Sequence, residues 1–528
     1  MKVSFLFSAN LSLLIICFSS QYPWPLLLLL LLFSLLPILL TSWLIPGGYA
    51  WRNHLNSSPT LQGPIGWPLL GSIPTLGRLG HRKLAELSTS LGATRLMAFS
   101  MGLTRVVISS HPDTAREILC GSAFSDRPTK ESARLLMFER AIGFAPSGEY
   151  WRHLRRIANN HMFSPRRIAG LEGVRRRIAG EMLERVWKEM EWRGFVELRG
   201  IVQKGSLDNV VESLFGRSMC LEGEELSLMV KEGYGLIAKF NWEDYFSLGF
   251  LDFSGVKRRC HKLAIRVNGM LSQVIVERRK EEERERKGRD DFLSVLLNLP
   301  DEEQLSDSDM VAVLWEMIFR GTDVLAILLE WIMARMVLHP DIQAKAQQEM
   351  DTCISENRHV RDSDIPNLPY LQAIVKEVLR LHPPGPLLSW ARLAICDVQV
   401  GKFFVPAGTT AMVNMWAITH NGSIWKDPWA FRPERFLEED VSIMGSDLRL
   451  APFGSGRRVC PGKALGLATV HLWLARLLQN FTWLPIPARS VDLSECLCLS
   501  LEMKKPLACR VLHRRTTISR DGFIEDLQ

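Results

Sequence analysis

The stretch Phe453-Gly-Ser-Gly-Arg-Arg-Val-Cys-Pro-Gly462 decides the fold of this chain. Glycine holds three of its ten positions, and glycine lets a backbone turn sharply and approach a large flat ligand closely. These turns leave backbone N–H groups free to point at the sulfur of Cys460 and stabilise a thiolate. Most free cysteines are inert core residues, so Cys460 alone would indicate little. The spacing Phe-x-x-Gly-x-Arg-x-Cys-x-Gly, followed by an apolar helical stretch at 463–478, favours a ligand-binding cysteine.

This loop resembles the haem-binding loop of the cytochrome P450 superfamily, in which the cysteine is the axial thiolate ligand of the iron. The resemblance implies haem b as cofactor and Cys460 as its metal ligand. It implies a mainly α fold with a small β-rich part, and it covers roughly 63–510. Within the loop it assigns three further cofactor-binding residues, Phe453, Gly456 and Arg458.

Composition places the chain among globular proteins. It has 528 residues, 47% hydrophobic and 23% charged, which is ample for a large core. The net charge of +7 suits an anionic membrane surface or an acidic redox partner, whereas its basic residues lack the clustering of a nucleic-acid binder. Of ten cysteines only Cys496 and Cys498 lie close together, and no Cys-x-x-Cys pair suggests zinc. We therefore expect a reducing, cytosolic environment for the main domain.

The N-terminus is directed to a membrane. Residues 24–45 are almost wholly apolar, about the 20 residues that a helix needs to cross a bilayer. We interpret them as an uncleaved single-pass signal anchor, the alternative being a cleaved signal peptide whose apolar region is 3–18. Whether 1–23 forms a second membrane segment stays open. Basic residues follow the anchor, which places the main domain on the cytosolic side, and we expect the endoplasmic reticulum membrane.

The domain organisation follows from these boundaries. A Pro/Gly-rich hinge at 46–75 should be a stiff, non-helical spacer, because proline fixes φ and removes a hydrogen-bond donor. The haem-thiolate domain is expected at 76–520, with a tail at 521–528. Inside the domain, the pattern predicts a strand at 106–110 and a helix at 111–119. A hairpin-rich unit is predicted at 398–413.

A long apolar helix is predicted at 309–338, interrupted by Arg320-Gly-Thr-Asp323. In the superfamily this helix crosses the haem, and an acid followed by threonine helps to deliver protons during oxygen activation. The resemblance gives that catalytic role to Asp323, with Thr322 as a doubtful substitute hydroxyl. Val324 stands where the threonine is expected, and valine has the same shape without a hydroxyl. We therefore expect reduced or uncoupled turnover, or a chemistry that needs less proton delivery.

Three further residues match positions that bind the haem propionates. Trp151 and Arg155 are four residues apart and share one helical face, and Arg392 lies far downstream. Arginine suits a carboxylate because its planar fork makes charge-assisted hydrogen bonds. Without the resemblance, a surface cation–π pair would be the simpler interpretation of Trp151 and Arg155.

The sequence also carries Glu377-x-x-Arg380, which by spacing alone would be a surface ion pair that contributes little. Its apolar setting and the downstream Pro-Glu-Arg435-Phe resemble the buried Glu-Arg-Arg triad of the superfamily. An aromatic patch at 240–253 is either core or part of a substrate pocket. The mixed-charge run at 277–291 is most simply a solvated helix end and loop.

Finer features are similar to one plant group, family seventy-eight, subfamily A. They are Phe319-Arg-Gly-Thr-Asp323, 381–390 and Phe124-Ser-Asp-Arg-Pro128. That group has threonine at the position of Val324, so the chain departs from it there. Members are implicated in organ growth, leaf initiation and seed size, and some hydroxylate fatty acids.

The resemblance implies a monooxygenase that hydroxylates a small apolar substrate, such as a fatty acid reached from membrane lipid. No Gly-x-Gly-x-x-Gly nucleotide loop occurs, so electrons from NADPH would come through a separate partner, NADPH-cytochrome P450 reductase. Two alternatives stay open, a reductase-independent hydroperoxide isomerase or dehydratase and a non-catalytic haem sensor. No nucleic-acid partner is expected.

Overall fold

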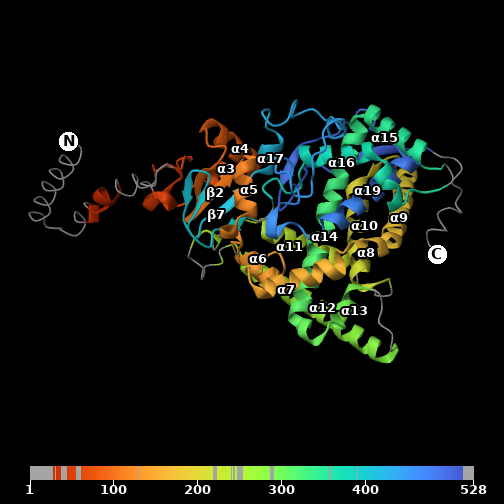
Figure 1. The fold of residues 1–528 in the computed structure, drawn as a ribbon, viewed down its shortest axis with the longest axis horizontal. Helices are drawn as coiled ribbons and strands as arrows, with labels where there is room; N and C mark the ends of the chain where they lie inside the picture. The colour runs from red at the N-terminus through yellow and green to blue at the C-terminus, as the bar shows by residue number, and fades with distance from the viewer. Residues whose placement is uncertain are drawn as a thin grey trace, which may run out of the picture.

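The computed structural model is mainly helical, and its largest sheet, which contains β2 and β7, lies at one end (Figure 1). It describes residues 28–29, 31–36, 44–54, 61–128, 130–217, 223–239, 241, 244–246, 252, 254–285, 291–355, 358–388 and 391–514. The N-terminal segment 1–23, the tail 521–528 and most of the aromatic patch at 240–253 lie outside these residues. Among the residues described, no helix is both long and apolar enough to cross a membrane.

Most of the chain lies in helices. They are α3 (Ile73–Leu76), α4 (Gly80–Ser90), α5 (Pro112–Cys120), α6 (Glu131–Leu136), α7 (Glu149–Ile157), α8 (Pro165–Gly170), α9 (Glu172–Arg193), α10 (Leu198–Phe215), α11 (Gly223–Ala238), α12 (Val256–Glu285), α13 (Phe292–Leu297), α14 (Asp307–Leu338), α15 (Pro340–Cys353), α16 (Pro369–Leu381), α17 (Met415–Thr419), α18 (Arg435–Glu438) and α19 (Lys463–Asn480). The helices predicted at 111–119, 309–338 and 463–478 correspond to α5, α14 and α19 within two residues at each end.

The strands form four small sheets. They are β1 (Met97–Met101), β2 (Thr104–Ser109), β3 (Val196–Glu197), β4 (Arg392–Leu393), β5 (Val398–Val400), β6 (Phe403–Val405), β7 (Thr410–Val413), β8 (Phe481–Leu484), β9 (Glu495–Leu497), β10 (Leu501–Met503) and β11 (Ala508–His513). The largest sheet has the order β1-β2-β7-β4, and β2 pairs with β7 in parallel with Val106 opposite Thr410. The prediction of a hairpin-rich unit at 398–413 is confirmed in part: β5 and β6 pair as a hairpin, whereas β7 joins the larger sheet.

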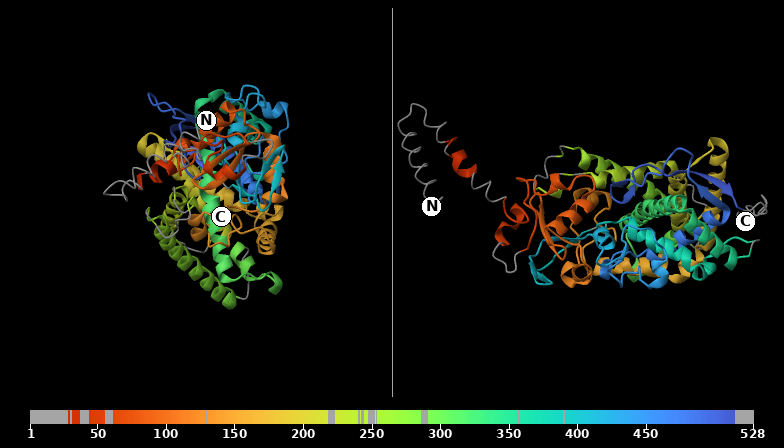
Figure 2. Two further views of the ribbon diagram at one scale, coloured as in Figure 1. Left: turned by 90° about the vertical axis from the view of Figure 1, so that its left-hand side faces the viewer. Right: turned by 90° about the horizontal axis from the view of Figure 1, so that it is seen from above.

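Both faces of that sheet are buried. Val107 of β2 packs in a cluster with Trp51 and Ala98, whereas Val106 and Ile108 pack in a second cluster with Phe99. This alternation is the two-residue period of a strand between two apolar layers. Figure 2 shows the sheet, with α3 and α4, at the opposite end of the long axis from α15 and α9.

Helix α14 runs through the centre of the helical part. The side chain of Ser306 accepts a hydrogen bond from the backbone N–H of Asp309 and so caps the first turn. Beyond it, apolar residues are buried on all sides, between α10, α12, α16 and α19. The helix is continuous through Arg320–Asp323, so the polar interruption in the sequence is not a break in the backbone. A helix that is apolar all round is expected to be buried in this way.

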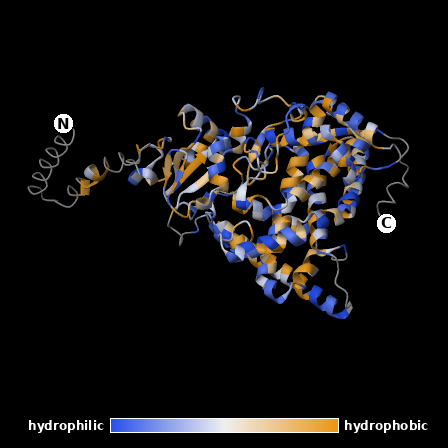
Figure 3. Ribbon diagram, viewed as in Figure 1, coloured by the Kyte–Doolittle hydropathy of each residue, from blue (hydrophilic) through white to orange (hydrophobic). Residues whose placement is uncertain are grey.

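The structure modifies one sequence-based expectation, for the hinge, and agrees with another, for the described part of the mixed-charge run. The described part of the hinge at 46–75 contains the 3-10 helix η1 (Tyr49–His54), so the hinge is not wholly non-helical. Trp51 holds this turn against the sheet, because its indole N–H donates to the carbonyl oxygen of Phe99 at 3.0 Å and its ring is buried. In the mixed-charge run, 277–285 forms the end of α12, which is hydrophilic in Figure 3.

Candidate active site

The Cys460 loop is a tight turn between the sheet region and α19. The backbone N–H of Cys460 donates to the carbonyl oxygen of Phe453 at 3.0 Å, which closes the loop. Gly456 has a φ of +69°, and a Cβ there would lie 2.3 Å from the carbonyl oxygen of Leu119. No other residue fits such a position, so the glycine is required for loop and α5 to meet.

A cavity of about 310 Å³ opens above this loop. Its walls come from α14, α10, the Cys460 loop, the start of α19 and the segment after α16, and most lining residues are apolar. Cys460 and Val324 both line it. The charged residues among the lining residues that the structure describes are five arginines and one glutamate: Arg127, Arg155, Arg320, Arg392, Arg458 and Glu316. The wall therefore carries an excess of positive charge.

Arg392 and Arg458 share one side of the cavity. Arg458 is fixed by the carbonyl oxygens of Ser125 at 3.1 Å and Ala145 at 2.7 Å. Arg392 donates to the carbonyl oxygen of Ser455 at 3.1 Å, and its buried Nε has no hydrogen-bond partner in the structure. Burial lowers the pKa of Arg392 to about 10, and the Arg458 guanidinium adds to this. The two buried cations thus lie close to each other and would be stabilised by an anion.

Arg155 and Trp151, both on α7, have different surroundings. Arg155 lines the cavity and donates to the carbonyl oxygen of Val459. Trp151 is not among the lining residues; its indole N–H donates to the carbonyl oxygen of Ile142 at 3.0 Å. The Arg458 guanidinium carbon lies 4.2 Å from the centre of the Trp151 ring. The structure therefore brings Arg155, Arg392 and Arg458 to the cavity and places Trp151 behind Arg458.

Of the three predicted catalytic positions on α14, only Val324 lines the cavity. The Thr322 hydroxyl is buried and donates to the carbonyl oxygen of Ile318 at 2.7 Å. Asp323 interacts with Glu502, Lys231 and Arg199 rather than with the cavity. Burial, and then the charge of Glu502, raises the pKa of Asp323 to about 6. Gly321 lets α10 approach α14, since a Cβ there would lie 2.7 Å from a methyl group of Val210.

Sequence reasoning missed three charged residues of the cavity: Arg127, Glu316 and Arg320. Glu316 accepts a hydrogen bond from the backbone N–H of Gly143 at 2.8 Å, and burial raises its pKa. Glu316 and Arg320 are four residues apart in an apolar helix, and that spacing places them on one face. Charged residues on a buried apolar helix were therefore the signal that would have found Glu316 and Arg320; Arg127 lies outside the helices and carries no such signal.

Burial acts on the cysteine as well. It raises the pKa of the Cys460 thiol, whereas the charge of Arg320 and the backbone N–H of Gly462 lower it. A metal ion that binds the sulfur deprotonates it outright.

A buried cluster between α16 and α18 is formed by Glu377 and Arg380 of α16 and Arg435 of α18. Both carboxylate oxygens of Glu377 accept from Arg380, at 2.8 and 2.9 Å, and Arg435 donates to Glu377 at 3.1 Å. Glu377 and Arg380 are fully buried. Arg380 also donates to the carbonyl oxygens of Thr419, Pro428 and Ala430, so it ties α16 to the segment before α18.

The chain belongs to the cytochrome P450 family, since the family model matches residues 61–509. It is accordingly a monooxygenase. Among curated proteins, it is 56% identical to cytochrome P450 78A5 of Arabidopsis thaliana over 89% of this chain and 92% of that protein. It is 50% identical to cytochrome P450 78A3 of Glycine max, over 90% of this chain and 92% of that protein. A flavonoid 3'-monooxygenase of Arabidopsis thaliana is 33% identical to it, over 89% of this chain and 94% of that protein. Within the family, the chain groups with the 78A proteins.

Members of this family carry haem iron held by a cysteine thiolate, and the cavity fits such a group. Cys460 lines it, and haem brings two carboxylates to a wall with surplus positive charge. The partnerless Nε of buried Arg392 is an available donor for one of them. Gly466 on α19 also lines the cavity, and a Cβ there would meet nothing within 4 Å, so there is open space at this point of the lining.

Proposed function

We propose that this chain hydroxylates an apolar substrate with a carboxylate head, in the class of fatty acids, with electrons from NADPH through a separate reductase. The observation that carries the proposal is one cavity lined by Cys460, by Val324 of α14 and by a set of arginines. When bound, the haem supplies reductive activation of dioxygen and transfer of one oxygen atom to a C–H bond.

Cys460 would hold the haem iron through its sulfur, because Cys460 lines the cavity and its loop is closed by the hydrogen bond to Phe453. Arg155, Arg392 and Arg458 are the proposed partners of the propionates. Arginine is suited to this task because it makes bidentate, charge-assisted hydrogen bonds to carboxylates. Trp151 supports the group indirectly, through its contact with the Arg458 guanidinium. The cluster of Glu377, Arg380 and Arg435 holds α16 in place.

The lining of the cavity supports an amphipathic substrate. Ile142, Leu328 and Leu388 contribute apolar surface, whereas Arg320 and Asn209 place polar groups in the α14–α10 part of the wall. A fatty acid would bury its chain on the apolar surface and pair its carboxylate with the Arg320 guanidinium. Apolar pockets with few placed polar groups bind ligands in this oriented way.

Val324 has a direct consequence for proton supply. The side chain that α14 presents to the cavity at this position has no hydroxyl, and the hydroxyl of Thr322 is engaged with its own helix. Asp323 does not line the cavity, so proton delivery then depends on water that would connect the cavity to it, and its pKa of about 6 lets it carry a proton near neutral pH. We propose that turnover is partly uncoupled, with loss of electrons to hydrogen peroxide.

We further propose attachment to the endoplasmic reticulum membrane through 24–45, with the main domain on the cytosolic side. The apolar run in the sequence supports the anchor, as does the exposure of its described leucines. Family members generally receive electrons from a reductase, and the exposed Arg457 beside the Cys460 loop offers positive charge to an acidic partner. A role in plant organ growth rests on the resemblance to family seventy-eight, subfamily A.

The test uses membranes that contain this chain and a plant reductase, supplied with NADPH and a panel of fatty acids and flavonoids. Hydroxylated product, NADPH consumption and hydrogen peroxide are quantified together. Hydroxylated fatty acid that depends on both NADPH and reductase supports the proposal. Product from flavonoids alone would contradict the substrate class, and product without reductase would contradict the electron source.

A further inference from the structure

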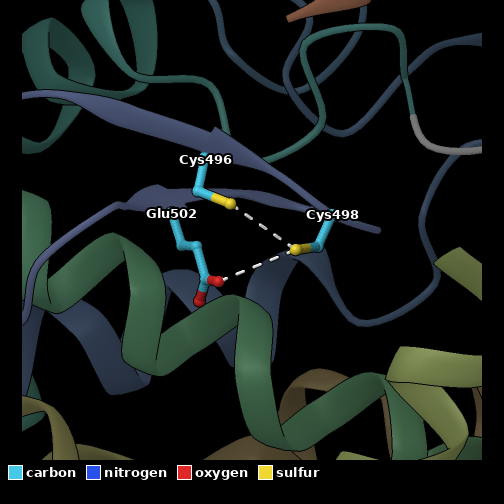
Figure 4. A group of neighbouring side chains, drawn as sticks. All are labelled: Cys496, Cys498 and Glu502. Atoms are coloured by element: carbon cyan, nitrogen blue, oxygen red, sulfur yellow. Dashed lines mark hydrogen bonds between the residues drawn. The ribbon is translucent and has the colours of Figure 1, made fainter. Parts of the chain in front are cut away.

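A second group of reactive side chains lies on the β9–β10 hairpin, outside the cavity. Cys496 and Glu502 are directly opposite each other in the antiparallel pair, and Cys498 is two residues beyond Cys496. Residues two apart in a strand, and residues paired across strands, point to one face of a sheet. All three side chains therefore converge, as Figure 4 shows. Among the residues described, this is the group of cysteine, histidine and acidic side chains that is close enough to share one metal ion.

The distances match those of a tetrahedral thiolate site. With a Zn–S bond of about 2.3 Å, tetrahedral geometry separates two sulfurs by about 3.8 Å, and sulfur from a carboxylate oxygen by about 3.5 Å. The two sulfurs here are 3.7 Å apart, and Cys498 Sγ lies 3.9 Å from Oε1 of Glu502. All three ligand atoms lie within 4.8 Å of one another, so a rotation of the Glu502 side chain is enough to close the site.

The hairpin is held from both sides, so its donors need little reorganisation. On its opposite face, Glu495 accepts from Arg82 at 2.7 Å. On the second strand, the carbonyl oxygen of Leu501 accepts from the indole N–H of Trp331 at 3.0 Å. The backbone N–H of Leu501 donates to the carbonyl oxygen of Pro384 at 2.8 Å. Sites built on rigid elements hold ligands more accurately than sites on loops.

The charges around the hairpin favour a cation. Two thiols and one carboxylate gather on this face of the hairpin, and Cys498 Sγ faces Oε1 of Glu502. One positive group, Arg199, has its guanidinium 3.9 Å from the other carboxylate oxygen of Glu502, and it pairs with Glu330 at 2.8 Å. Oε1 of Glu502 is left facing the sulfurs. Cys498 is exposed and the other two are partly exposed, so an ion can reach them.

We propose that Cys496, Cys498 and Glu502 bind a thiophilic divalent cation of the Zn²⁺ class, with water as the fourth ligand. The two thiols lose their protons when the ion binds, so each ion releases two protons, and no oxidant or reductant is involved. Thiolate sulfur selects soft ions such as Zn²⁺ and Cd²⁺ over Mg²⁺ and Ca²⁺.

The experiment uses the haem-loaded full chain in detergent. Zn²⁺ is added, free ion is removed by gel filtration, and the metal is counted per haem, with Cd²⁺ as a second probe read from its thiolate charge-transfer absorbance. The test variant is Cys496→Ser/Cys498→Ser. The matched control is Cys353→Ser/Cys396→Ser, which removes two exposed cysteines that lie apart from this hairpin. The haem absorbance spectrum checks that each variant is folded.

We expect one Zn²⁺ more per chain in the native protein than in the test variant, and full retention in the control. Glu502→Gln should weaken Zn²⁺ binding by at least about tenfold, the lower limit found for groups that only support ligands. Equal Zn²⁺ content in the native chain and the test variant would overturn the proposal, as would loss of binding in the control alone. A Cd²⁺ band without release of protons would also overturn it.

Discussion

The Thr322 hydroxyl donates a hydrogen bond to the carbonyl oxygen of Ile318 at 2.7 Å, one turn earlier in α14. This bond turns the hydroxyl into its own helix, and the side chain is buried away from the cavity. Val324, two residues later, faces the cavity with methyl groups alone. Val324 therefore gives the cavity a side chain with the shape of threonine but without its hydroxyl, and the hydroxyl of Thr322 does not replace it.

Val324→Thr should raise the fraction of NADPH electrons recovered as hydroxylated product and lower hydrogen peroxide correspondingly. General acid–base groups contribute roughly 10²–10⁴-fold to a proton-transfer step, so a shift in coupling of several-fold is a modest expectation. Product and peroxide are measured in the same reaction. Thr322→Val is the matched control: it removes a hydroxyl of the same helix that does not face the cavity, and coupling should not change. Equal coupling in the native chain and Val324→Thr would contradict the proposed role of position 324.

Glu377→Gln should lower both stability and haem content. It leaves the guanidinium groups of Arg380 and Arg435 buried beside a neutral amide, and breaking a buried ion pair costs about 3–5 kcal/mol. Thermal unfolding and the haem-to-protein ratio report the two effects. Lys345→Ala, which breaks the Lys345–Glu434 pair at the surface nearby, should cost much less, because the pair is exposed to solvent. Similar losses of stability and haem content in both variants would show that the buried cluster contributes no more to either than the surface pair does.

The main elements of the fold were predictable because their signals are local. The apolar period of 463–478 predicts α19, and the apolar run at 309–338 predicts α14, since burial on all sides leaves the sequence apolar throughout. The pairing of β7 with β2 was not predictable, because parallel partners are chosen by residues about 300 positions apart. The turn preceding β7 fits a hairpin equally well.

In the candidate site, too, residues with a local sequence signal could be predicted, whereas features that depend on distant residues or on helix register could not. Cys460, Arg392 and Arg458 could be found from short patterns, and all three line one cavity. The direction in which Thr322 and Asp323 point was harder to predict, since neighbouring residues on a helix differ by about 100° and small errors in register change the face. The distinct surroundings of Trp151 depend on Arg458, which is remote in sequence and could not be inferred from α7 alone.

Arg392→Gln should have opposite effects on the haem-free and haem-loaded protein. Without haem, Arg392 is a buried cation whose pKa is lowered to about 10, by burial first and by Arg458 next, so its removal should stabilise the apoprotein. With haem, the loss of a hydrogen bond to a charged group costs about 1.5–3 kcal/mol, which corresponds to haem release that is about tenfold faster or more. Haem transfer to apomyoglobin measures the second effect, and thermal unfolding of the apoprotein the first. Changes of the same sign would contradict a propionate partner at this position.

Arg320→Leu should raise KM for a free fatty acid by about tenfold or more while leaving KM for its methyl ester nearly unchanged. The ester has the same chain without the charge, so it is a control within one experiment. The physical reason is the loss of a charge-assisted hydrogen bond between the guanidinium and the carboxylate head group in a mostly apolar cavity. An equal rise for acid and ester would indicate that Arg320 shapes the cavity without binding the head group.

Asp323 should make the stability of the protein depend on pH in a known direction. Burial, and then the charge of Glu502, raises its pKa in the folded chain to about 6, from 3.8 for an ordinary aspartate. The folded state therefore binds the proton more tightly than the unfolded state, and this contribution to stability is present below about pH 4 and lost as pH rises through about 6. At 1.36 kcal/mol per pH unit, the loss is at most about 3 kcal/mol.

Asp323→Asn keeps the shape of the side chain and removes the titration. The stability of the variant relative to the native chain should therefore increase between about pH 4 and pH 6 and level off above that range. Unfolding is followed across the range by the loss of the haem absorbance band, with Asp440→Asn, an exposed carboxylate near Lys376, as the control. The control should show little slope, because its charge stays in water in both states. A difference between Asp323→Asn and the native chain that is constant with pH would mean that Asp323 keeps its ordinary pKa, and it would remove this group from the proton supply of the cavity.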